Sequence, residues 1–158
     1  MKLYDNHGHH EIYQHPCRVL LVEDNFDDQT LGKRALESLE DVEEVLCFSS
    51  GSELIAYMEQ QNADSHPAIS AIPTVIIIDL NMPGMDGFEV LKRLKSEIFF
   101  HTLPIIVVSD SPTFENVNRV MGLKAAAFFR KPLSACDLHA FLRNGRTWPS
   151  RDHAPRHE

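Results

Sequence analysis

The sequence predicts an α/β fold, a doubly wound sandwich in which helices cover both faces of a parallel sheet. Two observations lead to this prediction. Short apolar runs rich in β-branched residues recur along the chain, and each is followed by a segment with apolar residues at helical spacing. This alternation repeats five times. Continuous apolar strands separated by amphipathic helices are typical of a parallel sheet that is buried on both sides.

The first two strand–helix units follow from two apolar runs, Val19–Val22 and Val42–Phe48, which we expect to be strands. Helical spacing after the first run predicts a helix there, and a capping box of Ser50 with Glu53 predicts another after the second. The side chains expected to face the core from these helices are Leu31, Ala35, Leu39, Leu54, Ile55 and Met58.

The other three units follow a longer polar connection at residues 62–73. Their predicted strands are Thr74–Ile78, Ile105–Val108 and Ala126–Phe129. Asp86 with Glu89, Pro112, and Ser134 with Asp137 mark the starts of the three helices. The residues expected on their buried faces are Phe88, Leu91, Leu94, Ile98, Phe114, Val117, Met121, Leu138, Phe141 and Leu142.

Composition excludes several classes of protein. The 158 residues carry a net charge of −8, which argues against nucleic-acid binding through phosphate contacts. No apolar run approaches the roughly 18 residues that a membrane span needs, and the first residues have no apolar signal-peptide core. Three scattered cysteines without CxxC spacing argue against a disulfide framework or a zinc site. We therefore expect a cytoplasmic protein with reduced thiols that binds neither nucleic acid nor membrane.

We expect one domain at residues 17–144 with a polar tail at each end. Residues 1–16 have no hydrophobic period and contain four histidines. This predicts a solvated arm, with transition-metal binding as the alternative. Residues 145–158 are polar and contain two prolines. They are too short for a second domain, so we expect no output domain after residue 144.

Chemically active side chains follow the predicted strands. In an open parallel sheet the functional site lies beyond the carboxyl ends of the strands. Glu23 and Asp24 follow the first strand, Asp79 the third, Ser109 the fourth and Lys131 the fifth. Each alone is common as a turn, cap or solvated residue. Their joint occurrence at four strand ends indicates a site.

The residue types at this edge suit phosphoryl chemistry. Three neighbouring carboxylates repel one another unless a cation lies among them. Oxygen ligands favour Mg²⁺, and the lysine adds a second positive charge. The metal, Lys131 and the Ser109 hydroxyl would neutralise the equatorial oxygens of a phosphoryl group, and a carboxylate facing the metal can act as the nucleophile.

Four segments along this edge share one known pattern. They are Val19–Asn25, Ile78–Gly87, Val108–Ser109 and Phe128–Pro132. They resemble the receiver domain of two-component response regulators, over residues 17–144. The resemblance implies a (βα)5 flavodoxin-like sandwich with strand order 2-1-3-4-5. Within the family, the chain is similar to small stand-alone receivers such as the chemotaxis regulator, and most similar to the phytochrome-associated single-domain regulators.

The resemblance implies roles for the site residues. Asp79 would be the phosphoacceptor, taking a phosphoryl group from a phosphohistidine, and would also contribute to the Mg²⁺ site. Asp24 would bind Mg²⁺ directly, Glu23 through water and Asn81 through its backbone carbonyl. Lys131 would pair with Asp79 at rest and with a phosphoryl oxygen afterwards.

The resemblance also implies a switch. Ser109 would move toward the phosphoryl group, and Phe128 would swing inward into the space vacated, so that phosphorylation reweights two existing conformations. The Lys131–Pro132 bond would be cis. Asn81 and Ser111 flank the pocket at positions that tune the phosphoryl lifetime in the family.

One residue departs from the family pattern. The residue after Ser109 is Asp110, where the family usually has alanine or another small residue. Its carboxylate would repel the phosphoryl group, restrict access to it or turn away into solvent. This puts the efficiency of phosphorylation in question.

The implied function is a signalling switch that catalyses only its own phosphorylation and dephosphorylation. The donor would be a sensor histidine kinase, of the phytochrome type by the closer resemblance, or a histidine phosphotransfer protein. The output would be a downstream protein target, with a homodimer through the last helix–strand–helix face as a further expectation. Two alternatives stay open, a phosphorylation-independent interaction module and a phosphorelay intermediate or phosphate sink. An aspartate-nucleophile phosphatase would need an acid where Asn81 stands.

Overall fold

The structure is a computed structural model that describes residues 16–63, 74–98 and 100–143. Nearly all of the predicted N-terminal tail, the C-terminal tail and most of the 62–73 connection lie outside the described residues.

Five parallel strands form one sheet in the order β2-β1-β3-β4-β5. The prediction of a doubly wound sandwich with this strand order is confirmed. Each strand falls on its predicted run, with ends that differ by no more than two residues. The strands are β1 (Cys17–Val22), β2 (Val42–Phe48), β3 (Thr74–Asp79), β4 (Ile105–Ser109) and β5 (Ala127–Arg130).

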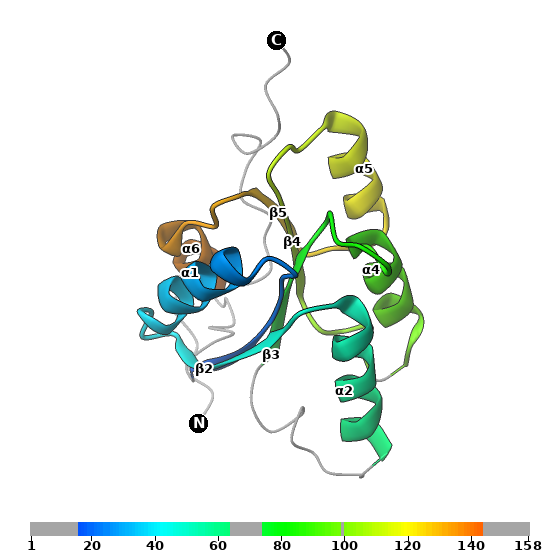
Figure 1. Ribbon diagram of the computed structural model, residues 1–158, viewed down its shortest axis with the longest axis horizontal. Helices are drawn as coiled ribbons and strands as arrows, with labels where there is room; N and C mark the ends of the chain where they lie inside the picture. Colours follow the sequence, from blue (N-terminus) through cyan, green and yellow to red (C-terminus); the bar gives the residue numbers. More distant parts are fainter. Residues whose placement is uncertain (1–15, 64–73, 99, 144–158) are drawn as a thin grey trace, which may run out of the picture.

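Helices cover both faces of the sheet. Two of them, α1 and α6, lie on one face, while α2, α4 and α5 lie on the other (Figure 1). In the described part of the chain, no helix is long and apolar enough to cross a membrane. The helices are α1 (Phe26–Glu37), α2 (Gly51–Ala63), α4 (Gly87–Ser96), α5 (Phe114–Gly122) and α6 (Ala135–Arg143).

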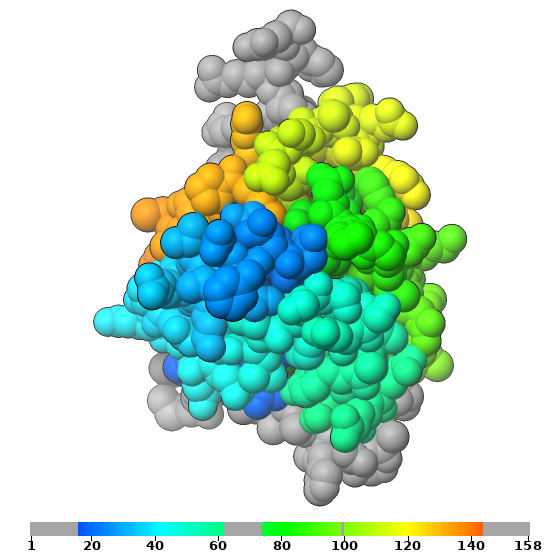
Figure 2. All heavy atoms as spheres, viewed as in Figure 1, coloured from blue at the N-terminus to red at the C-terminus, as the bar shows by residue number. Residues whose placement is uncertain are grey.

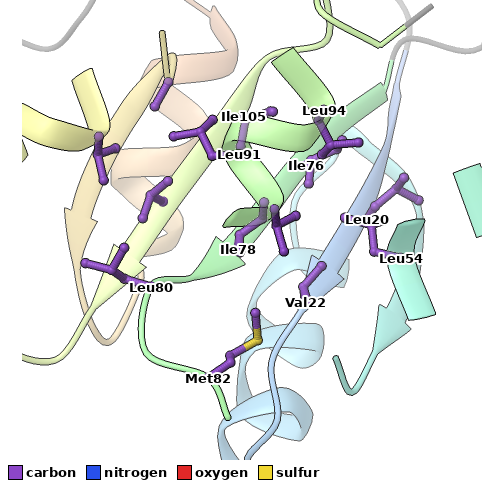
Figure 3. Close-up of a cluster of buried hydrophobic side chains, with 14 of the residues drawn as sticks. Leu20, Val22, Leu54, Ile76, Ile78, Leu80, Met82, Leu91, Leu94 and Ile105 are labelled. Carbon is purple, nitrogen blue, oxygen red and sulfur yellow. The ribbon is translucent and has the colours of Figure 1, made fainter. Parts of the chain in front are cut away.

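Strand alternation divides the core into two clusters. On β4, Ile105 and Val107 pack toward α2, α4 and α5, while Ile106 and Val108 pack toward α1 and α6. Figure 3 shows the first cluster, in which Leu91 and Leu94 of α4 lie against the strand residues. Burial on both faces explains why the strands are continuous apolar runs rather than alternating ones.

The predicted caps hold three helices in place. The Asp86 carboxylate accepts a hydrogen bond from the Glu89 amide at 3.0 Å, and the Ser134 hydroxyl accepts one from the Asp137 amide at 3.2 Å. The Ser50 hydroxyl likewise accepts from the Glu53 amide at 3.1 Å. These side chains satisfy amides that have no partner within the first helical turn.

Four expectations about helix faces and starts are wrong. Leu31, Ile98 and Phe114 are 64%, 79% and 55% exposed. Ile98 lies beyond the end of α4, so helical spacing no longer sets its direction, and Leu36 supplies the buried contact of α1. Pro112 does not begin α5: Thr113 is the N-cap, which leaves the first helical residue, Phe114, facing solvent.

Candidate functional site

The carboxyl ends of the central strands meet at one edge of the sheet. β1 and β3 are neighbours, and so are β3 and β4. Asp79 is the last residue of β3 and Ser109 the last of β4, while Glu23 directly follows β1. All three are buried, with exposed fractions of 5%, 0% and 4%. Polar side chains this deeply buried need partners.

Lys131, one residue beyond β5, supplies the partner for two of them. Its Nζ lies 2.9 Å from Asp79 Oδ2 and 2.5 Å from Glu23 Oε2. The predicted pairing of Lys131 with Asp79 is therefore present in the structure. The Lys131 amide donates to the Ser109 carbonyl at 2.9 Å, which fixes the backbone of the loop against β4. The following bond to Pro132 is cis, as expected.

Backbone amides occupy the remaining oxygens of both carboxylates. Asp79 Oδ1 accepts from the Asn81 amide at 3.1 Å, and Glu23 Oε1 accepts from the Asn25 amide at 3.0 Å. Each bond closes a tight turn just after a strand. The two acidic side chains are thus held by the loops that carry them, which restricts their orientation before any ligand arrives.

Three carboxylates converge closely enough to share a cation. Oxygens of Glu23, Asp24 and Asp79 all lie within 4.8 Å of one another. Asp24 is exposed, and so offers the accessible ligand of the three. An all-oxygen set of this kind fits a hard divalent cation such as Mg²⁺, which keeps several waters and needs only one or two carboxylates.

Ser109 is joined to the loop that follows Asp79. Its Oγ accepts hydrogen bonds from Asn81 Nδ2 and from the Ser111 amide, both at 3.3 Å. Ser109, Asn81 and Ser111 are therefore joined by hydrogen bonds, and the Asn81 amide links them to Asp79.

Burial and pairing set the electrostatics. Burial raises the pKa of Glu23, and the hydrogen bonds from Lys131 and the Asn25 amide oppose this only in part. For Lys131, burial alone would lower the pKa, but contacts with Glu23 and Asp79 outweigh it and raise the pKa above its usual range. Lys131 is therefore charged under all ordinary conditions.

The close approach of α4 to the end of β3 depends on a glycine. A Cβ at Gly87 would lie 2.7 Å from Leu80 Cα and 2.8 Å from the Asp79 carbonyl oxygen. The start of α4 therefore passes against the backbone that positions Asp79, an approach that only glycine permits.

The predicted switch aromatic is already inside the protein. Phe128 is 2% exposed and belongs to the core cluster beneath α4 and α5. Across the β4–β5 pairing, Val107 lies opposite Phe128, and Ser109, two residues further along β4, lies opposite Arg130. Phe128 is therefore buried in this structure, and its role as a switch stays a prediction.

Asp110 is exposed. It directly follows Ser109 and lies on the rim of the site, where it lines the same pocket as Glu23 and Lys131.

Sequence reasoning missed two residues of α1. Lys131 Nζ also lies 3.4 Å from Asp28 Oδ2. Gln29 Nε2 donates to the Glu23 carbonyl at 3.1 Å and to the Phe48 carbonyl at 3.3 Å, which ties α1 to the acidic loop and to the end of β2. The four-residue spacing from Asp24 to Asp28 could have suggested the first contact. Nothing in the sequence distinguishes Gln29 from any other polar helix residue.

The doubly wound sheet and its acidic edge place the chain in the receiver class of α/β proteins. Residues 19–143 match the response regulator receiver domain family, and the chain belongs to this family. It is therefore a receiver domain of the two-component response regulators.

Known relatives support the same assignment. Two-component response regulator ARR16 of Arabidopsis thaliana is 29% identical over 85% of this chain and 83% of its own length. Response regulator Rcp1 of Synechocystis is 28% identical over 78% of this chain and 82% of its own length. The solved structure of the bacteriophytochrome response regulator AtBRR is 28% identical, with a TM-score of 0.68 over 87% of this chain and 99% of that one. The chain spans 56% of the length of two other Arabidopsis relatives, the two-component response regulators ARR8 and ARR9.

Proposed function

We propose that this chain is a Mg²⁺-dependent signalling switch that accepts a phosphoryl group on Asp79. One observation carries the proposal. Asp79 is a buried carboxylate that contacts Lys131 at 2.9 Å and shares a metal-sized cluster with Glu23 and Asp24. A nucleophile, an ammonium group and a place for a cation therefore meet at one point.

Phosphoryl transfer breaks the P–N bond of a phosphohistidine and forms a P–O bond to Asp79, while the ring nitrogen keeps the electron pair. Mg²⁺, held by Glu23, Asp24, Asp79 and the Asn81 carbonyl, would neutralise charge on the phosphoryl oxygens. Lys131 moves from the Asp79 carboxylate to a phosphoryl oxygen. In this way the chain catalyses its own phosphorylation.

The change reaches the rest of the fold through Ser109. Its hydroxyl now accepts from Asn81 and Ser111, and it would donate to the new phosphoryl group. Because Phe128 is already buried, phosphorylation would stabilise this inward placement rather than create it. The surface of β5 and its flanking helices would then present the altered state to a protein target and to a second copy of the chain.

The donor in this proposal is a sensor histidine kinase or a histidine phosphotransfer protein. Similarity to AtBRR, a bacteriophytochrome response regulator, favours a phytochrome-type kinase. We place the protein in the cytoplasm. Its three cysteines are free, as in proteins of reducing compartments. We place the domain at residues 17–144, with the tails outside it.

The test is phosphate uptake from acetyl phosphate with Mg²⁺, read by intact mass spectrometry. We expect one phosphoryl group on the wild type and none on Asp79→Asn. Glu115→Gln, which changes an exposed acid on α5, is the control and should be phosphorylated normally. Uptake by Asp79→Asn would contradict the proposal.

A lack of uptake with Mg²⁺ still bound would favour the phosphorylation-independent interaction module. The observation that favours this second candidate is Asp110, an extra carboxylate on the rim. Uptake restored in Asp110→Ala would identify that carboxylate as the cause. A phosphoryl group passed rapidly to a histidine phosphotransfer protein would instead indicate a phosphorelay intermediate.

A further inference from the structure

A pocket of about 250 Å³ lies between α1 and α6, beside the phosphoacceptor site. Figure 2 shows the two helices next to each other on this face, α1 in blue and α6 in orange. Three neighbouring strands form its floor through Leu21, Ile77 and Val108, and the helices contribute Leu36 and Leu138 to its walls. The lining at depth is therefore apolar.

Small side chains explain why the space is open. Gly32 and Ala35 on α1 and Ala135 on α6 all line the pocket. A Cβ at Gly32 would lie 3.3 Å from Leu21 Cδ2, so α1 runs close to β1 at this point, and yet no large side chain fills the gap toward α6. An apolar cavity of about 150 Å³ is already large enough to bind benzene.

The rim carries an excess of negative charge. Asp28, Asp110, Glu23 and Lys131 all border the pocket. Lys131 lies 2.5 Å from Glu23 but 3.4 Å from Asp28, so Asp28 receives the weaker contact. Asp110 forms no ion pair with any residue that the structure describes, and it is exposed. The carboxylates of Asp28 and Asp110 are thus available to a positively charged group.

We propose that this pocket binds a small organic cation, an aromatic or alicyclic ring that carries one ammonium group. The ring occupies the apolar floor, and the ammonium group lies at the rim near Asp28 and Asp110. Burial of the ring supplies the attraction, and the rim charges select a cation and exclude an anion. The site gives a role to Asp110, which the phosphoryl chemistry does not use. It does not depend on phosphorylation of Asp79.

The test is a titration of the ¹⁵N-labelled full chain, followed by amide chemical shifts in the presence of Mg²⁺. Three probes share a phenyl ring: 2-phenylethylamine is the cation, 2-phenylethanol the neutral analogue and phenylacetate the anion. We expect saturable shifts of the amide signals centred on Gly32, Val108 and Leu133. The amine should bind with the highest affinity and the anion with the lowest.

Three substitutions and one control separate the charge of the rim from the shape of the pocket. Asp110→Asn should weaken amine binding by about two- to five-fold, as for an exposed ion pair, and leave the alcohol unchanged. Glu115→Gln, an exposed acid on the opposite face, should change neither. Ala35→Leu and Ala135→Leu fill the pocket from opposite walls, and each should abolish binding of the amine and the alcohol.

Three results would overturn the proposal. They are the absence of saturable shifts with all three probes, equal affinity for amine and anion, and undiminished binding in a filled variant. The same spectra show whether each filled variant is folded. If neither folds, the Asp110→Asn result alone decides whether the rim charge selects the ligand, and an unchanged amine affinity there would also overturn the proposal.

Discussion

Replacing Lys131 with alanine should expose how strongly the site depends on one cation. In the described part of the chain, no other lysine or arginine contacts Glu23 or Asp79. The side chains of these two acids are 5% and 7% exposed, and that of Lys131 is 11% exposed. Removing one partner of a buried ion pair usually costs about 3–5 kcal/mol. Because Lys131 sits at the rim, we expect the lower end, about 3 kcal/mol in Mg²⁺-free buffer, or roughly 10 °C in Tm.

The loss of stability in Lys131→Ala should depend on pH. The pKa of Glu23 is raised in the folded protein. An acid whose pKa is higher in the folded than in the unfolded protein stabilises the fold most when it is protonated. This contribution is complete when the pH is below the unfolded pKa, and it is lost as the pH rises through the folded pKa. Without the Lys131 hydrogen bond, the pKa of Glu23 rises further. The variant should therefore recover part of its stability relative to the wild type when the buffer changes from about pH 7.5 to about pH 5.

Thermal and urea unfolding, with and without Mg²⁺, measure these effects. Mg²⁺ should stabilise Lys131→Ala more than the wild type, because the metal replaces the lost charge. Lys33→Ala is the matched control: it removes an exposed ion pair to Glu37, whose two side chains are 47% and 52% exposed, and should cost less than about 0.5 kcal/mol. The double variant with Glu23→Gln and Lys131→Ala should lose less free energy of unfolding than the two single variants lose in sum. If Lys131→Ala is as stable as Lys33→Ala at both pH values, the reasoning is refuted.

Three further predictions concern the surroundings of the site. Gly87→Ala should destabilise the fold by about 1–3 kcal/mol, because its Cβ would meet backbone; Gly122→Ala, which meets nothing within 4 Å, should be neutral or stabilising in urea unfolding. Gln29→Ala removes the side-chain hydrogen bonds that tie α1 to the Glu23 and Phe48 carbonyls, although the Phe48 carbonyl still accepts from the Glu23 amide. It should weaken Mg²⁺ binding a few-fold by calorimetry, whereas a purely structural role would lower Tm and leave the affinity unchanged. At about pH 8, an alkylating reagent should modify the exposed Cys136 well before Cys17, because burial raises the pKa of Cys17 to about 11; equal rates in peptide mapping would contradict the burial of Cys17.

The sequence contained enough information to locate the site because a parallel sheet translates chain order into position. Once the apolar runs are recognised as strands, their ends must meet at one edge. Glu23, Asp79, Ser109 and Lys131 therefore come together for topological reasons, without knowledge of any side-chain contact. The strand order itself followed from the resemblance to receiver domains rather than from the pattern.

The helix faces were harder to predict, and the errors have a physical cause. An apolar residue in a helix is buried only if its side chain lies on the face of the helix that packs against the sheet. Leu31 has the wrong phase, because α1 rests on Leu36 instead. Phe114 shares a face with the buried Val117, but it is the first residue of α5 and lies at the solvent-exposed end of that face. The pocket between α1 and α6 could not be predicted at all, since it depends on the separation of two helices distant in sequence.

The buried acids show why fold and switch are difficult to separate in this protein. Glu23 and Asp79 would be poor core residues in isolation, because burying a carboxylate without a partner is strongly unfavourable. Lys131 compensates for both, and it does so from the far end of the chain, across 108 and 52 residues. In the proposed function, a phosphoryl group on Asp79 would add negative charge at this point and would draw the ammonium group toward the phosphoryl oxygens. Each change of charge at the site must therefore be balanced by moving Lys131 or by binding a cation, and this requirement couples the chemistry of Asp79 to the packing of β1, β3 and β5.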